Sequence, residues 1–144
     1  MTENYKFIRN IGYLGLIPFV SGAILSTGLI PSNADLQKWI VMFAIHYAAI
    51  ILSFMSGVLW GFELLSEHEK SKHAIIIVLI PPLWASLSYF LPLRCFLFAI
   101  GFLGLYWLDI FMARKKATPE WWLKLRAPLT TLVVASLVVM GFND

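Results

Sequence analysis

Five long apolar segments constrain what this chain can fold into. Short polar stretches separate them, and they cover residues 11–30, 39–65, 74–91, 93–112 and 119–142. Each segment is long enough to cross about 30 Å of hydrocarbon as an α-helix, which satisfies its own backbone where water is absent. None alternates polar and apolar residues as a strand of a membrane barrel does. The sequence therefore predicts an all-α integral membrane bundle of five transmembrane helices, forming a single domain over residues 1–144.

The composition agrees with a membrane location. Of the 144 residues, 60% are hydrophobic and only 13% are charged, which lies outside the range of ordinary soluble domains. The net charge of +3 comes from basic residues beside the apolar segments rather than on one amphipathic face. Nucleic acid is therefore not an expected partner. The expected partners are membrane lipids, other membrane protein subunits or a second copy of the chain.

The basic residues predict how the chain is threaded. With the N-terminus in the cytoplasm, nine of the 11 Lys and Arg residues fall on the cytoplasmic side, whereas Lys38 and Arg94 fall outside. An excess of positive charge on the cytoplasmic side is the general rule for inserted helices. We therefore expect a cytoplasmic N-terminus and an external C-terminus.

An aspartate interrupts the fourth apolar segment, in the stretch YWLDIFMARKK. Asp109 precedes Arg114 by five residues, or about 7 Å along a helix, and Arg126 lies about 6 Å past Trp122. Because the chain reverses between them, these two depths match. An unpaired acid at the centre of a membrane helix costs about 2.5–3.5 kcal/mol, and a guanidinium relieves much of that cost. The sequence therefore predicts an ion pair between Asp109 and Arg126.

Glu63 lies at the cytoplasmic end of the second apolar segment and is expected in the same layer, where it can join the pair as a third charge. With Trp60 and Tyr106, these residues make up the candidate polar layer. Two interpretations stay open. The charges either orient helix ends and reach toward water, or form a cytoplasmic-side pocket that holds a proton, an ion or a lipid head group.

The second apolar segment also carries a set of small and polar residues at spacings of three, four and seven. We expect them to form one face of the helix. The face either packs against another helix or provides a polar track from the outer half toward the cytoplasmic end. Its members are His46, Ser53, Ser56, Gly57, Trp60 and Glu63.

Two adjacent prolines, Pro81 and Pro82, lie in the middle of the third apolar segment. They remove backbone donors and free the carbonyls of Ile77 and Val78. The break either forms a substrate site, as in transporters with discontinuous helices, or is a kink whose carbonyls a serine or water satisfies. No metal site is expected, because the other two histidines lie in a cytoplasmic loop and cannot reach His46.

Two stretches of the sequence resemble a known family. The stretches SGVLWGFEL (residues 56–64) and YWLDIFMARKKATPEWWLKLRAPLTTLVV (residues 106–134) are similar to the domain-of-unknown-function 3429 family of small bacterial inner-membrane proteins. That family also includes the mitochondrial transmembrane protein 69. Many members have a histidine where this chain has Leu59. The residues that carry the resemblance most specifically are Gly57, Trp60, Gly61, Asp109, Pro119, Trp121, Arg126, Leu129 and Thr130.

The resemblance covers nearly the whole chain and implies a multi-pass protein of the bacterial inner membrane, without supplying a reaction. No nucleophile elbow, P-loop, dinucleotide fingerprint or zinc-protease signature occurs in the sequence. These observations favour a non-enzymatic accessory or assembly partner of a larger membrane complex, such as a respiratory one. One alternative is a small proton-coupled transporter or carrier that uses Pro81, Pro82, His46, Glu63 and Asp109. The other is a protein that binds a lipid or a quinone, and no further cofactor is expected.

Overall fold

The computed structural model describes residues 2–66 and 72–143, which form seven helices and, within these ranges, no strand. The helices are α1 (Thr2–Leu14), α2 (Ile17–Ser26), α3 (Ala34–Leu65), α4 (Lys72–Ile77), α5 (Ile80–Phe90), α6 (Arg94–Arg114) and α7 (Glu120–Asn143). They combine into five spans that are long and apolar enough to cross a membrane, because α1 continues into α2 and α4 into α5. The predicted all-α bundle of five membrane-spanning helices is confirmed.

Prolines break the first and the third span. Pro18 and Pro81 each lie in the first turn of the helix that follows a break. A proline lacks an N–H and its ring clashes with the carbonyl four residues earlier. Those earlier residues are Leu14 and Ile77, at which α1 and α4 end. The segment expected to be one helix over residues 11–30 is therefore two helices, and the first of them begins already at Thr2.

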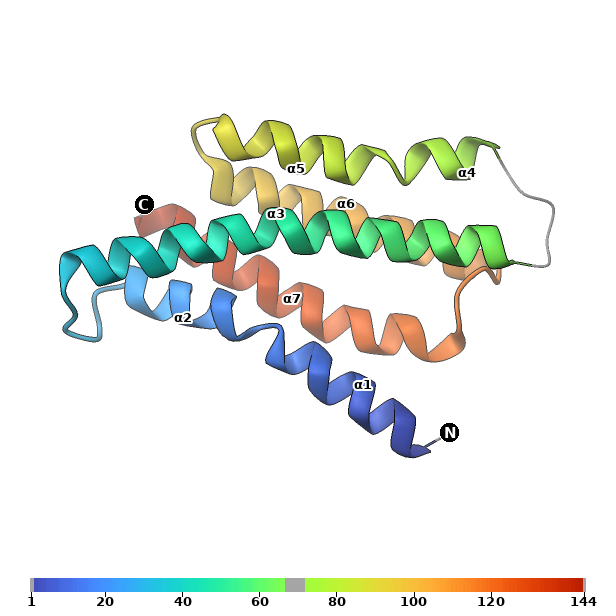
Figure 1. Cartoon of the computed structure of the whole chain (residues 1–144), viewed down its shortest axis with the longest axis horizontal. Coiled ribbons are helices and arrows are strands. Elements are labelled where there is room, and N and C mark those ends of the chain that lie inside the picture. Colours follow the sequence, from blue (N-terminus) through green and yellow to red (C-terminus); the bar gives the residue numbers. More distant parts are fainter. Residues whose placement is uncertain (1, 67–71, 144) are drawn as a thin grey trace.

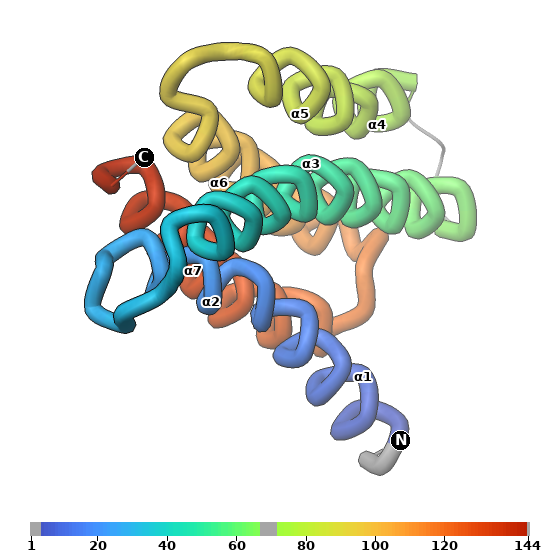
Figure 2. Tube along the Cα trace, turned by 60° about the vertical axis from the view of Figure 1, so that its left-hand side comes forward, coloured from blue at the N-terminus to red at the C-terminus, as the bar shows by residue number. Residues whose placement is uncertain are grey.

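The central element is α3, whose 32 residues correspond to about 48 Å of helix. The α2 and α7 helices lie on one side of α3 and the α4–α5 span lies on the other, with α6 behind (Figure 1). The start of α1 diverges from the bundle in both views (Figures 1 and 2). The two ends of the chain lie at opposite ends of the long axis, as an odd number of spans requires. The cytoplasmic side of the N-terminus stays a prediction from the basic residues.

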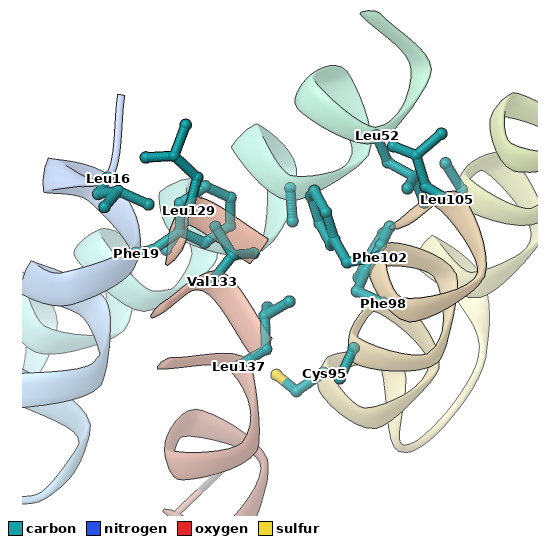
Figure 3. Close-up of a cluster of buried hydrophobic side chains, with 14 of the residues drawn as sticks. Leu16, Phe19, Leu52, Cys95, Phe98, Phe102, Leu105, Leu129, Val133 and Leu137 are labelled. Atoms are coloured by element: carbon teal, nitrogen blue, oxygen red, sulfur yellow. The ribbon is translucent and has the colours of Figure 1, made fainter. Parts of the chain in front are cut away.

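The core of the bundle forms where α2, α3, α6 and α7 meet (Figure 3). Phe19 of α2 packs edge to face on Phe102 of α6, with ring centroids 6.0 Å apart. Leu52 of α3 and Leu137 of α7 are completely buried beside them. Large apolar side chains from four helices therefore converge at mid-bundle, where they hold the spans in a fixed arrangement.

A glycine at position 22 permits close packing of three helices, and it provides the first test of the fold. A Cβ at Gly22 would lie 2.9 Å from the Cβ of Ala44 on α3 and 2.8 Å from the Sδ of Met140 on α7. We therefore expect Gly22→Ala to lower the free energy of unfolding by about 1–3 kcal/mol through overpacking. Denaturant unfolding in detergent micelles, followed by circular dichroism, measures the change.

The matched control for this test is Gly104→Ala on α6, where an added Cβ meets no atom within 4 Å. We expect it to leave the stability unchanged or to raise it by up to about 1 kcal/mol, because alanine favours helices more than glycine does. Equal stability of the two variants would contradict the packing of α2 described above.

Candidate functional site

An ion pair between Asp109 and Arg126 is buried between α6 and α7. The Nε of Arg126 donates to Oδ2 of Asp109 at 2.8 Å, and the two side chains are 5% and 1% exposed. The indole Nε1 of Trp122 donates to the other carboxylate oxygen, Oδ1, at 2.7 Å. Both oxygens of the carboxylate therefore have a strong donor, which is the arrangement that makes a buried charge tolerable.

The local sequence explains why these three side chains meet. Trp122 and Arg126 are four residues apart on α7, so they lie on the same face of that helix. A short turn joins α6 to α7, and Lys116 within it has a φ of 56°, which reverses the chain. This hairpin brings Asp109 level with the face that carries Trp122 and Arg126. The predicted contact between Asp109 and Arg126 is therefore present, and it is extended by an indole.

Helix α3 covers the pair from the other side. The ring of Phe62 packs edge to face on Trp122, with centroids 5.0 Å apart. The guanidinium of Arg126 uses only its Nε toward Asp109, and its Nη2 is buried without a hydrogen-bond partner among the described residues. A donor bonded to nothing in a buried site costs about 1–3 kcal/mol. The Nη2 of Arg126 is therefore available to donate a hydrogen bond.

The other members of the predicted polar layer do not join this pair. Glu63 is buried on α3 and has interactions of its own, but within the described residues it forms no ion pair with Arg126. Trp60 is 42% exposed, and Tyr106 is partly buried. Among the described residues, the ion pair at this site joins Asp109 and Arg126.

The predicted polar face of α3 is divided in the structure. Ser56 is buried like Glu63 and Ser53 is partly buried, whereas His46 and Gly57 are exposed like Trp60. On a helix with 3.6 residues per turn the six positions fall within a sector of about 120°, and this sector straddles the boundary between the buried and the exposed side of α3. His46 packs edge to face on Tyr89 of α5 at the outer surface, with ring centroids 5.8 Å apart.

A side chain from another helix forms a hydrogen bond to the backbone at the break before the two prolines. Pro81 is buried and Pro82 is partly buried. The hydroxyl of Ser56 on α3 donates to the carbonyl of Val78, one of the two carbonyls expected to be freed. Of the two interpretations offered by the sequence, the structure therefore favours a kink satisfied by a neighbouring serine.

An elongated cavity of about 320 Å³ lies beside the ion pair, enclosed by α1, α2, α3 and α7. It is lined from Tyr47 to Val58 on α3 and from Trp122 to Val133 on α7, about eleven residues or about 16 Å along each helix. Leu16, Phe19, Leu129 and Val133 form its deeper wall, and Figure 3 shows them facing one another across the α2–α7 interface. The cavity is therefore long, narrow and mostly apolar.

Polar side chains line the cavity at a few positions. Arg126 and Thr130, one turn apart on α7, both belong to the lining. The Oγ1 of Thr130 and the Nη2 of Arg126 are both buried without a hydrogen-bond partner among the described residues. An apolar cavity beside two unsatisfied polar groups is the usual composition of a ligand site.

The cavity opens sideways, toward the surroundings of the bundle. Ile11 of α1 and Phe54 of α3 line it and yet are 52% and 62% exposed. Ile8, nearer the N-terminus on α1, also lines the cavity and is exposed. In a membrane this opening faces lipid, between the diverging α1 and α3.

Trp122, Thr130 and the cavity are missing from the residue set predicted from sequence spacing. A signal for the first two does exist, because Trp122, Arg126 and Thr130 follow one another every four residues. That spacing places an indole, a guanidinium and a hydroxyl on one face of a membrane helix. No comparable signal exists for the cavity. Within residues 2–66 and 72–143, no group of three or more His, Cys, Asp or Glu side chains is placed to hold a metal ion.

Comparison with known families agrees with the extent of this fold. The model of a family described as "Protein of unknown function (DUF3429)" matches residues 5–142. The match includes every residue of the ion pair and of the cavity lining. No curated protein and no solved structure matches the chain.

The ion pair gives a test based on stability. We expect Arg126→Met to lower the free energy of unfolding by about 3–5 kcal/mol, because it leaves the Asp109 carboxylate buried without its cation. Adding Asp109→Leu to that variant removes both charges and is expected to recover most of the loss. Denaturant unfolding in detergent measures both variants.

The matched control is Lys124→Met, the same kind of substitution at an exposed position of α7. It is expected to change the stability by less than about 0.5 kcal/mol. A double variant less stable than Arg126→Met alone would contradict the assigned role of the Asp109 charge.

Proposed function

Since the chain belongs to the DUF3429 family, whose description assigns no activity, we propose a function from its site. We propose that this multi-pass protein acts in the bacterial inner membrane and binds the hydrocarbon chain of a lipid or a quinone in the cavity between α1, α2, α3 and α7. The single observation that carries the proposal is the elongated apolar cavity lined by a buried, incompletely bonded arginine.

The shape of the cavity supports a chain-like ligand. The cavity combines a volume of about 320 Å³ with a length of about 16 Å, so it is longer than it is wide. An extended hydrocarbon chain matches that elongated shape. The volume lies at the lower end of the range typical of small-molecule sites. The cavity therefore suits part of an amphipathic molecule rather than a whole phospholipid.

The position of the polar residues supports a defined orientation. Arg126 lines the half of the cavity nearer the start of α7. Thr130, one turn further along, lies past the middle and closer to Val133, which lines the deeper half with Phe19. In one orientation, an oxygen-containing head group lies beside Arg126 and accepts its hydrogen bond, while an apolar tail packs against Phe19. A ligand in the opposite orientation leaves the buried donor unpaired, which is costly.

The lateral opening supports entry from the bilayer. Ile8, Ile11 and Phe54 face both the cavity and the surroundings. A ligand dissolved in lipid reaches such an opening without passing through water, so its tail stays in an apolar medium throughout. The break before Pro18 separates α1 from α2, so α1 is held apart from the core that fixes α2.

The carrier alternative lacks comparable support. It depends on freed carbonyls at the proline break and on a polar track along α3 that starts at His46. The hydroxyl of Ser56 donates a hydrogen bond to the carbonyl of Val78, and His46 lies on the outer surface. Neither feature leads to Asp109.

A cavity-filling substitution tests the proposed function. We expect wild-type protein purified in mild detergent to retain a lipid or quinone that solvent extraction and mass spectrometry identify. Val133→Phe fills the deeper half of the cavity and is expected to reduce the retained ligand by about tenfold, equivalent to about 1.4 kcal/mol of binding free energy. Recovery of wild-type protein without any bound amphiphile would overturn the proposal.

Val139→Phe is the matched control, since it makes the same change on the same helix at a partly exposed position outside the cavity lining. It is expected to retain as much ligand as the wild type. Circular dichroism and size-exclusion profiles of both variants separate loss of ligand from loss of the fold.

One observation favours a second candidate function, that of a non-enzymatic accessory or assembly partner in a larger membrane complex such as a respiratory one. Gly57 and Gly61 are four residues apart on α3, and a Cβ added to either meets no atom within 4 Å. With Trp60 between them, they form an open small-residue face on the outside of the bundle. Faces of this kind let a helix of another membrane protein approach closely.

The second candidate has its own test. We expect the double substitution of Gly57→Leu and Gly61→Leu to remove chains that co-purify with the wild type in mild detergent, as identified by mass spectrometry. Gly104→Leu is the matched control, because that glycine on α6 is equally open. Recovery of the wild type as a monomer without other chains would count against this candidate.

A further inference from the structure

The charge of the residues at the polar end of the cavity restricts which head group can bind there. Arg126 carries a positive charge and is paired at 2.8 Å with the negative charge of Asp109. The two charges cancel, so the buried group as a whole is neutral. What it still offers to a ligand is the Nη2 donor of Arg126 and the hydroxyl of Thr130, which have no hydrogen-bond partner among the described residues.

The hydrogen-bonding character of these groups is specific. A guanidinium only donates hydrogen bonds, whereas a threonine hydroxyl donates one and accepts others. Arg126 and Thr130 are one turn apart on α7, so both groups can lie close to one ligand oxygen. A carbonyl oxygen has two lone pairs and can accept from both at once.

An anionic head group is disfavoured at this position. A carboxylate or phosphate would have to share the guanidinium that already neutralises Asp109, leaving a net negative charge in a buried site. Burial of an ion without its own counter-charge costs several kcal/mol. The other basic residues near this end, Lys6, Arg9 and Lys124, are exposed on α1 and α7 and do not line the described part of the cavity.

Building on the proposed function, we infer that the ligand carries an uncharged carbonyl group at the end of a single hydrocarbon or isoprenoid chain. Two sources supply this chemistry, a fatty-acyl ester and a prenylated quinone. In both, the carbonyl oxygen accepts hydrogen bonds from Arg126 and Thr130, and the chain extends toward Phe19 and Val133. The inference separates these ligands from free fatty acids and from lipids whose phosphate must be buried.

A matched pair of probes tests the charge of the head group. Full-length protein freed of bound lipid is titrated with a fatty acid methyl ester, with the free fatty acid of the same chain length, and with a short-chain prenylated benzoquinone. Native mass spectrometry of the detergent-solubilised protein measures the dissociation constants. The titration is made at about pH 9, where a carboxylic acid of ordinary pKa is ionised.

We expect the ester or the quinone to bind at least about tenfold more tightly than the free acid. Whichever of the two binds more tightly identifies the source of the carbonyl. Equal or tighter binding of the free acid would overturn the inference while leaving the proposed function standing. Failure of all three probes to bind, together with wild-type protein that retains no amphiphile, would overturn both.

A pair of threonine variants tests where the head group lies. Thr130→Val removes the hydroxyl at nearly constant volume and is expected to weaken binding of the tighter probe by about two- to tenfold. Thr131→Val is the matched control, since its neighbouring hydroxyl is exposed and donates to the backbone carbonyl of Ala127. Equal affinities of the two variants would place the head group elsewhere and contradict the assignment.

Discussion

The ion pair between Asp109 and Arg126 is the interaction on which the rest of this structure depends. Two opposite charges in an apolar environment must meet, because each alone is costly to bury and together they are tolerable. The indole of Trp122 completes the shell of the carboxylate. The pair therefore fixes both the depth and the rotation of α7 against α6, within a bundle whose other contacts are mostly apolar and adaptable.

That fixed rotation decides which residues of α7 face the cavity. Trp122 and Arg126 bond to Asp109 and also line the cavity, and Leu129, Thr130 and Val133 follow on the same side of α7. The break before Pro18 then matters, because α2 packs into the core through Phe19 while α1 diverges (Figure 2). A continuous, straight first helix cannot pack into the core along one part and diverge from it along the other. The cavity is thus the space left between a helix held by an ion pair and a helix bent by a proline.

Several features of the fold and site follow from the sequence because their causes are local. The number of spans, the match in depth of Asp109 and Arg126, and the break at Pro81 and Pro82 depend on residue type and spacing alone. The burial of the polar residues of α3 does not follow, because His46 and Ser56 belong to the same predicted face but differ in burial. Which polar residue is buried depends on neighbouring helices, and here the break between α4 and α5 presents the carbonyl of Val78 to Ser56 and not to His46.

The sequence by itself determined that the chain is a five-span membrane protein with an acid and a base at one level of two consecutive spans. Hydrophobicity and rise per residue are properties of each segment, so no tertiary information is needed for that conclusion. Only the tertiary structure decided that Trp122 is buried against Asp109, that Glu63 forms no ion pair with Arg126 within the described residues, and that a cavity lies beside Arg126. Each of these depends on how side chains from separate helices fill or fail to fill shared space, and that packing is not encoded in any single segment.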